Sequence, residues 1–160
     1  MSQRLIYVMD PMCSWCWGFA PVIDAIAEAY PLLPLRLVAG GLRANHGAPL
    51  DEHTRAVLAE HWQTVAEDSG QPDVEDVTHA AVLVALAESV GYPPAEFGEL
   101  FDQQKTREMT LADVAWVADL GMAGLPILLA EREGQLALLA NGCQPADQVL
   151  GLLARWVEAG

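Results

Sequence analysis

Two cysteines separated by two residues, Cys13 and Cys16, are the part of the sequence best suited to chemistry. They follow the apolar run of residues 5–9, which predicts a buried strand, and they open a segment with helical spacing of apolar residues up to Tyr30. A thiol in the first turn of a helix faces unpaired backbone N–H groups and the positive end of the helix dipole, and both favour the thiolate. We therefore predict that Cys13 is the nucleophile of a redox dithiol and that Cys16, one turn away, is the resolving thiol.

A CxxC pair is also half of a common type of zinc site, so the motif alone leaves two chemistries open. His46, His53 and His61 follow in the chain and could be combined with the two cysteines into a metal set. Neither a second CxxC nor a compact pair of histidines supports that combination, so we expect no metal. Three cysteines do not make a structural disulfide framework, and the third, Cys143, has no obvious partner.

Length and charge limit the function classes. A chain of 160 residues suits one domain with an inserted lobe, and 52% hydrophobic residues are ample for a core. The formal net charge of −14 disfavours nucleic acids and anionic membrane surfaces as partners. No apolar stretch approaches the roughly 20 residues that cross a bilayer, and the first residues lead into the first strand without a signal-type apolar region. We therefore expect a cytoplasmic location.

The segment that holds the dithiol is predicted to be a strand, helix, strand unit. Residues 32–39 predict a second strand that ends at Gly40–Gly41 and runs parallel to the first after a right-handed crossover. Pro21 interrupts the helical pattern and predicts a kink beyond the first turns. From Leu50 to about Lys105 the spacing becomes helical, which predicts an insertion of several helices.

The last third of the chain returns to sheet-forming patterns. Thr110 and Asp113 resemble a capping box and predict a helix that begins there and ends at Gly121. The apolar runs of residues 127–130 and 136–140 flank Glu133–Gly134, which predicts a hairpin. A final helix follows. Within the insertion, a further helix is predicted to begin at Pro93–Pro94, and a linker is predicted at Gln71–Pro72–Asp73.

Three segments together resemble the DsbA-type oxidoreductases of the thioredoxin superfamily, with the cytoplasmic FrnE-like branch the more similar. They are residues 8–19, VMDPMCSWCWGF, residues 40–43, GGLR, and residues 121–126, GMAGLP. The resemblance implies an α/β thioredoxin fold formed by residues 1–43 and 108–160, with residues 44–107 as an inserted helical subdomain. That insertion is shorter than is usual in the branch, and the contraction falls between Gly70 and His79.

The resemblance also implies roles for single residues. Cys13 matches the attacking cysteine of the family, Cys16 its resolving cysteine, and Pro126 the proline whose cis peptide bond lies beside the dithiol. The alternative is a trans proline that begins the next strand. Leu125 would present backbone polar groups to an extended client peptide. The residues expected to contact the client are Ser14, Trp15 and Leu125.

Four other positions have two interpretations each. Cys143 is either an incidental buried thiol or a third redox thiol. Asp10 is either an ordinary turn residue or a carboxylate that raises the pKa of the nearby thiol. His61 and Trp62 could both cover the active site. The alternatives are that His61 is a solvated or capping histidine and that Trp62 packs into the core.

These observations predict a protein dithiol-disulfide oxidoreductase that acts on protein or peptide thiols and disulfides, with glutathione as a possible redox partner and no resident cofactor. Two alternatives stay open. One is a glutathione-dependent kappa-type transferase or 2-hydroxychromene-2-carboxylate isomerase-like enzyme, against which the second cysteine argues. The other is a non-catalytic or metal-holding binding module. Apolar area on the inserted helices could support a homodimer.

Overall fold

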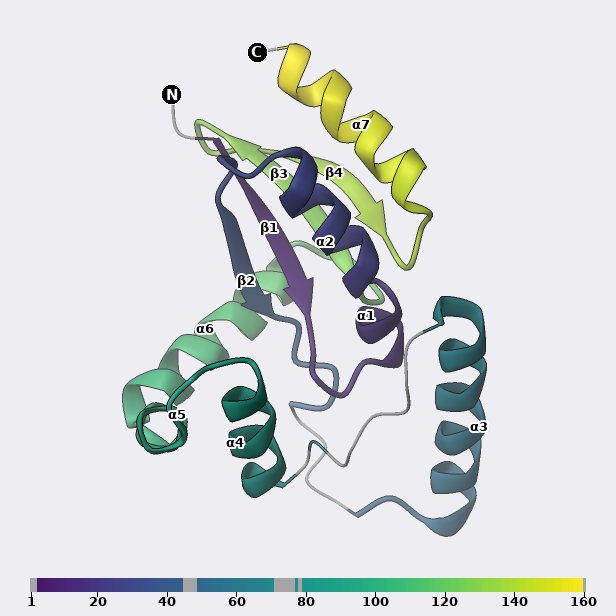
Figure 1. The fold of residues 1–160 in the computed structure, drawn as a ribbon, viewed down its shortest axis with the longest axis vertical. Helices are drawn as coiled ribbons and strands as arrows, with labels where there is room; N and C mark the ends of the chain where they lie inside the picture. The colour runs from purple at the N-terminus through teal and green to yellow at the C-terminus, as the bar shows by residue number, and fades with distance from the viewer. Residues whose placement is uncertain (1–2, 45–48, 71–76, 78, 160) are drawn as a thin grey trace.

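The computed structural model describes residues 3–44, 49–70, 77 and 79–159. The elements in chain order are β1 (Gln3–Met9), α1 (Ser14–Gly18), α2 (Ala20–Ala29), β2 (Leu35–Ala39), α3 (Glu52–Ser69), α4 (Ala80–Ser89), α5 (Pro94–Asp102), α6 (Gln104–Asp119), β3 (Ile127–Arg132), β4 (Gln135–Asn141) and α7 (Ala146–Glu158). The strands form a four-stranded sheet in the order β2-β1-β3-β4 (Figure 1). β1 and β2 are parallel, and β3 is antiparallel to both β1 and β4. The predicted α/β fold class is confirmed.

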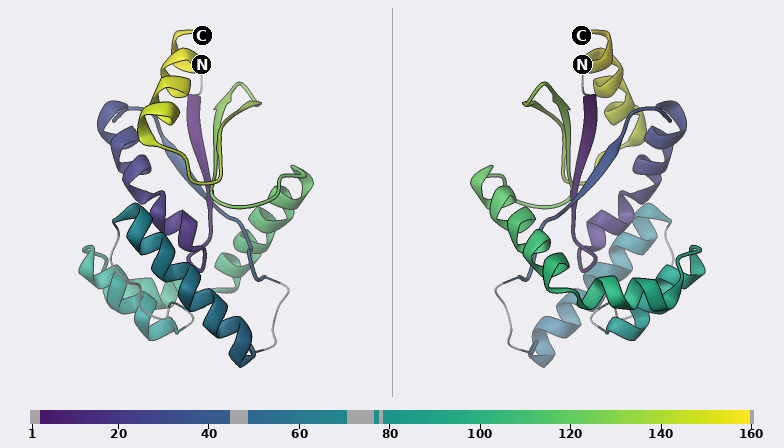
Figure 2. Two further views of the ribbon diagram at one scale, coloured as in Figure 1. Left: turned by 90° about the vertical axis from the view of Figure 1, so that its right-hand side faces the viewer. Right: turned by 90° about the vertical axis from the view of Figure 1, so that its left-hand side faces the viewer.

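Helices cover both faces of this sheet. Figure 2 shows α2 and α7 on one side of the strands and α6 on the other. Leu5 and Tyr7 of β1 belong to the core under α2 and α7, whereas Ile6 and Val8 belong to the core that includes Val117 of α6. Because successive side chains of a strand point to opposite faces, a strand buried on both sides must be apolar throughout. This explains the uninterrupted apolar run before the cysteines.

The helical segment after β1 is divided in two. α1 ends at Gly18 and α2 begins at Ala20, with Phe19 between them. Pro21 lies in the first turn of α2, where an N–H would be unpaired in any case; inside a continuous helix its ring would clash with the preceding turn. The predicted kink is confirmed, and the break itself lies at Phe19.

The predicted start of the second strand is wrong. β2 begins at Leu35 rather than at residue 32, and Leu32 is 95% exposed. The carbonyl oxygen of Pro34 accepts a hydrogen bond of 2.8 Å from the backbone N–H of Leu5, so pairing with β1 begins at this point. Pro34 itself has no N–H to donate to a ladder.

The predicted start of the helix at Thr110 is also wrong, because α6 begins at Gln104. The hydroxyl of Thr110 donates a hydrogen bond of 2.9 Å to the carbonyl oxygen of Thr106 inside the helix. Asp113 reaches across to β2, where its carboxylate accepts hydrogen bonds from the Arg36 side chain at 3.0 Å and from the backbone N–H of Ala39 at 3.2 Å. The apparent capping box is therefore a tertiary contact between α6 and β2. α6 also crosses the 107/108 boundary without interruption.

The hairpin between β3 and β4 and the final helix α7 are confirmed. Glu133 and Gly134 have φ values of 52° and 81°, and two consecutive positive φ values are typical of the tight turn that suits the twist of paired strands. The helix predicted at Pro93–Pro94 is confirmed as α5. The linker predicted at residues 71–73 lies outside the described residues.

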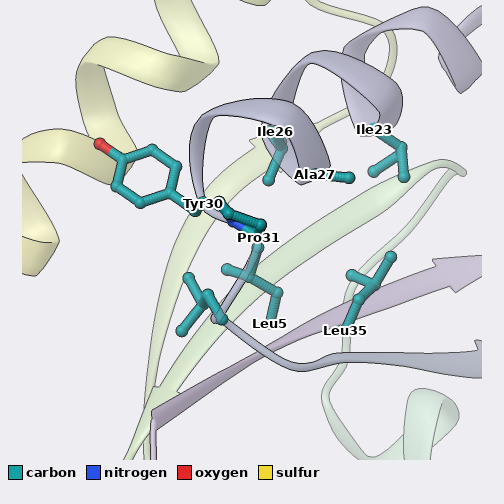
Figure 3. A pocket seen from close by; sticks show the side chains of 8 residues that line it. Leu5, Ile23, Ile26, Ala27, Tyr30, Pro31 and Leu35 are labelled. Carbon is teal, nitrogen blue, oxygen red and sulfur yellow. The ribbon is translucent and has the colours of Figure 1, made fainter.

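The structure has a small pocket away from the cysteines. A small apolar pocket is formed by α2 and the starts of β1 and β2, with Ile23, Leu5 and Leu35 among its lining residues (Figure 3). It lies at the opposite end of the sheet from the cysteines, which follow the end of β1.

None of the helices in the part of the chain that the structure describes has the length and apolarity needed to cross a bilayer.

Candidate active site

The turn between β1 and α1 is organised by the carboxylate of Asp10. One oxygen accepts a hydrogen bond of 2.9 Å from the backbone N–H of Met12, and the other accepts one of 2.9 Å from the backbone N–H of Leu42, which follows β2. The carbonyl oxygen of Asp10 accepts a third from the backbone N–H of Cys13, also at 2.9 Å. Asp10 therefore joins the turn before the first cysteine to the loop after β2.

Cys13 lies at the N-cap of α1. Its carbonyl oxygen accepts hydrogen bonds from the backbone N–H groups of Cys16 and Trp17, at 3.0 and 3.2 Å, so it closes the first turn of the helix. Its sulfur accepts a hydrogen bond from the backbone N–H of Cys16 at 3.3 Å. Both cysteines are in the thiol state; Cys13 is 6% exposed and Cys16 is 3% exposed. The structure thus brings the two predicted thiols together at the start of a helix.

The two thiols have opposite pKa shifts. The hydrogen bond from the Cys16 side chain is the main cause that lowers the pKa of Cys13, and backbone N–H groups of Cys16 and Trp15 add to it. Burial and the charge of Asp10 act in the other direction on the Cys13 pKa, so both interpretations of Asp10, turn residue and nearby charge, hold. The same hydrogen bond to Cys13, followed by burial, raises the pKa of Cys16 far above its ordinary value. The site therefore holds one thiolate-forming cysteine and one that keeps its proton.

Pro126 lies at the end of the sheet at which β1 ends. It precedes Ile127, which pairs with Val8 near the end of β1, and it is fully buried. The Leu125–Pro126 peptide bond, which the family resemblance implied to be cis, is cis in the structure. The carbonyl oxygen of Pro126 accepts a hydrogen bond of 2.7 Å from the backbone N–H of Gly142, so this oxygen already has a hydrogen-bond partner within the chain.

Leu125 is held by its side chain and has free backbone groups. A Cβ atom placed on Gly40 would lie 2.6 Å from a methyl carbon of Leu125, so the leucine packs directly over this glycine. Among the described residues, the backbone N–H and carbonyl of Leu125 have no hydrogen-bond partner. This arrangement suits the expected role of Leu125 in pairing with an extended client.

The two residues between the cysteines are placed differently from each other. Ser14 is 5% exposed, so its side chain offers a client little surface. Trp15 is half-buried, and its ring meets the ring of His61 on α3 edge to face, with 5.7 Å between the centroids. α3 packs against α1 so closely that a Cβ on Gly18 would lie 3.1 Å from a methyl carbon of Val65. α3 therefore contributes His61 to the surroundings of the dithiol, as one of the two interpretations of this residue proposed.

Tyr7 is a residue of the site that the sequence analysis missed. It is 5% exposed, and its hydroxyl donates a hydrogen bond of 3.0 Å to the carbonyl oxygen of Cys16. Burial is the main cause that raises the pKa of Tyr7, and the charges of Cys16, Cys13 and Cys143 add to it. The available signal was a hydroxyl-bearing side chain in an otherwise apolar strand, since such a group needs a partner when it is buried.

The expectation that Cys143 is buried is wrong, because this residue is exposed. It follows β4 by two positions, beyond Gly142, and partial burial still raises its pKa. Of the histidines considered for a metal set, His46 lies outside the described residues. Within the described ranges, no three His, Cys, Asp or Glu side chains gather in a way that could hold a metal ion.

Comparison with solved structures identifies the fold. No protein-family model and no curated protein sequence matches the chain. A candidate protein disulfide isomerase from Nitrosomonas europaea superposes with a TM-score of 0.87 at 28% identity, with 99% of each chain covered. The cytosolic disulfide reductase DsbM from Pseudomonas aeruginosa gives a TM-score of 0.74 at 22% identity, covering 96% of this chain and 98% of its own, and has also been crystallised with glutathione.

A 2-hydroxychromene-2-carboxylate isomerase shares the fold more distantly, with a TM-score of 0.59 at 13% identity over 98% of this chain and 95% of its own. Two of the structures that resemble this chain are thus thiol-disulfide oxidoreductases of the DsbA type, and they match it over nearly its whole length. The chain has the DsbA-like fold of the thioredoxin superfamily.

Proposed function

We propose that the chain is a thiol-disulfide oxidoreductase that exchanges disulfides with protein or peptide clients through Cys13 and Cys16. One observation carries the proposal: the Cys13 sulfur lies at the start of α1, 3.3 Å from the backbone nitrogen of Cys16, and the Cys16 thiol stabilises its thiolate. The lowered pKa favours Cys13 as the attacking sulfur, while the raised pKa of the buried Cys16 keeps that sulfur a thiol until the resolving step.

The exchange proceeds through a mixed disulfide. In the reducing direction, the Cys13 thiolate attacks one sulfur of a client disulfide, and the other client sulfur leaves as a thiolate. Cys16 then attacks the Cys13 sulfur, which releases the second client thiol and forms the Cys13–Cys16 disulfide. In the oxidising direction the same steps run backwards. In isomerisation a different client thiolate attacks the client sulfur of the mixed disulfide, which forms a new client disulfide and releases Cys13 as a thiolate. The direction depends on the reduction potential of the pair against that of its surroundings.

The client is proposed to lie along the loop that precedes β3. The free backbone groups of Leu125 can pair with an extended peptide, and Trp15 offers a half-buried aromatic surface beside Cys13. Pro126 is a rigid residue without a backbone N–H at this end of the sheet. We place the function in the cytoplasm with glutathione as the redox partner, and the cytosolic DsbM, crystallised with glutathione, supports that choice.

The distant likeness to an isomerase favours a second function, activation of glutathione without a protein dithiol. The two functions differ in whether the reaction needs the Cys13 thiol. A glutathione-activating enzyme would keep its activity when Cys13 is replaced by serine, whereas a dithiol oxidoreductase would lose it. The resolving thiol lying against Cys13 supports the dithiol function.

A redox titration of the purified full chain in glutathione buffers tests the proposal. Thiols are trapped at each potential, and peptide mass spectrometry locates the disulfide. We expect a reversible Cys13–Cys16 couple, unchanged in a Cys143→Ala control. Cys13→Ser should abolish client reduction, and Cys16→Ser should accumulate mixed disulfides. Equal client turnover by the parent protein and Cys13→Ser would contradict the proposal.

A further inference from the structure

The proposed exchange requires Cys16 to ionise in a place that opposes ionisation. Cys16 is 3% exposed, so water cannot solvate a thiolate there, and burial adds to the rise of its pKa. While Cys13 is a free thiolate, the Cys16 thiol donates to it. Once Cys13 is bonded to a client, that acceptor charge is gone, and the Cys16 proton must leave before its sulfur can attack. The resolving step therefore needs a group that stabilises negative charge on the Cys16 sulfur.

Tyr7 presents such a group at the right position. Its hydroxyl lies 3.0 Å from the carbonyl oxygen of Cys16, at the end of a rigid ring that is 5% exposed. The ring packs against Phe19, with 6.0 Å between the centroids, so the phenol cannot swing away. Only the hydroxyl proton is free to turn about the C–O bond. The Cys16 side chain is near enough to this hydroxyl to add to the rise of the Tyr7 pKa. Burial and the nearby cysteine charges raise the pKa of Tyr7, so the phenol keeps this proton throughout.

We infer that Tyr7 is a catalytic residue for the resolving step, in which its hydroxyl proton turns from the carbonyl oxygen of Cys16 to the Cys16 sulfur as that sulfur ionises. The inference rests on the proposed dithiol function and adds a residue from β1 to it. A preorganised donor in a water-excluded site stabilises developing charge without any rearrangement of the chain.

The step is balanced as written. The Cys16 thiol loses its proton to solvent, and the sulfur, with Tyr7 donating to it, attacks the Cys13 sulfur of the mixed disulfide. The new Cys13–Cys16 bond forms as the bond between Cys13 and the client breaks, and the electron pair leaves on the client sulfur. That sulfur takes up a proton from solvent. Tyr7 ends the step with its own proton and is ready to turn back to the carbonyl oxygen.

The experiment separates the two steps with one equivalent of dithiobis(nitrobenzoate), in a Cys143→Ala background that removes the exposed thiol. Attack by Cys13 releases the first coloured thiolate, and resolution by Cys16 releases the second. Tyr7→Phe removes the hydroxyl and keeps the ring. We expect it to slow the second phase about tenfold or more, the effect of losing a hydrogen bond to a charged group. The first phase should change less than about twofold, and the pH profile of the second should move to higher pH.

Tyr30→Phe is the matched control, because Tyr30 follows α2 at the end of the sheet away from the cysteines. It should change neither phase. A second phase that Tyr7→Phe leaves unchanged overturns the inference, and so does an equal slowing of both phases, which is what general damage to α1 would cause. Failure of the parent protein to release either thiolate would instead contradict the proposed dithiol function.

A second measurement covers the case in which Tyr7→Phe does not fold. The chain has three tyrosines, so a Tyr30→Phe, Tyr92→Phe double variant grown on 3-fluorotyrosine carries the label at Tyr7 alone. The fluorinated phenol is a stronger donor, so the second phase should become faster while the first does not change. A second phase that is the same or slower with the label overturns the inference.

Discussion

Replacement of Cys16 tests how the thiolate of Cys13 is stabilised. The Cys13 sulfur has two kinds of donor: the Cys16 side chain, which is the main cause of its lowered pKa, and backbone N–H groups at the start of α1, one of which lies 3.3 Å away. Cys16→Ala removes the first kind and leaves the second. Cys16→Ser keeps a hydroxyl donor at the same position. Both variants are made with Cys143→Ala, so that Cys13 is the only thiol.

The expected magnitude follows from the loss of one hydrogen bond to a charged acceptor in a buried site, which costs about 1.5–3 kcal/mol. At a pH well below the pKa of Cys13, this loss lowers the fraction of Cys13 that is ionised about ten- to one-hundredfold. The remaining thiolate is a better nucleophile, with a Brønsted coefficient of about 0.4–0.5, so roughly half of the effect on a logarithmic scale is recovered in the rate. Alkylation of Cys16→Ala should therefore be about three- to tenfold slower than that of Cys16→Ser in mildly acidic buffer.

The assay is the rate of alkylation by iodoacetamide across pH, with the ultraviolet absorbance of the thiolate as a direct measure of ionisation. The alanine variant should be the slower one at low pH. At high pH, where Cys13 is ionised in both variants, it should be about three- to tenfold faster, because its thiolate is the more basic nucleophile. Equal rates at low pH would refute the reasoning that the Cys16 side chain stabilises the thiolate. An alanine variant that stays slower than the serine variant at high pH would show that access to Cys13, and not its ionisation, had changed.

The remaining predictions concern stability and exposure. Gly41→Ala should destabilise the protein by about 2–4 kcal/mol in denaturant unfolding, because the left-handed backbone costs about 1–2 kcal/mol and overpacking adds to it; its φ is +65°, and the added Cβ would lie 2.6 Å from Val114. Gly121→Ala, with φ +63° and open space around it, should show the backbone cost alone. The reduced protein should lose stability as pH rises above about 9–10, because the folded chain keeps protons on Tyr7 and the buried resolving thiol that the unfolded chain releases; an unchanged unfolding midpoint across this range would contradict the raised pKa values. In the oxidised protein, Cys143 should be the thiol that a maleimide labels without denaturant, as peptide mass spectrometry can check; labelling that requires unfolding would contradict its exposure.

Local patterns predicted the parts of the fold that depend on neighbours in sequence. Apolar spacing and turn residues were enough for the βαβ unit, for the hairpin at Glu133–Gly134 and for the break near Pro21. They failed at Thr110 and Asp113, because the cap-like spacing was local whereas the carboxylate is used by Arg36 on a distant strand. A motif of that kind has the same appearance in sequence whether its partner is near or far.

The site divides in the same way. The cysteines and the proline could be named from spacing and resemblance, because both record positions along the chain. Tyr7 donates to a residue nine positions later, and His61 meets Trp15 only after α3 has folded back over α1. The exposure of Cys143 likewise depends on what covers the end of β4. These features are set by how the elements pack together, and no local pattern carries that information.

The burial of the two cysteines has a consequence for damage by oxidants. A thiolate-forming cysteine is the kind of residue that peroxides convert to sulfenic acid and then irreversibly to sulfinic acid, and susceptibility depends on access as well as ionisation. Cys13 is 6% exposed, so solutes in bulk water reach it less often than they reach an exposed thiol. A sulfenic acid that did form would lie against Cys16, which condenses with it to the disulfide, a state that thiols can reverse. The pair therefore has a route back from oxidation that the exposed Cys143 lacks, and the dithiol can pass through repeated cycles.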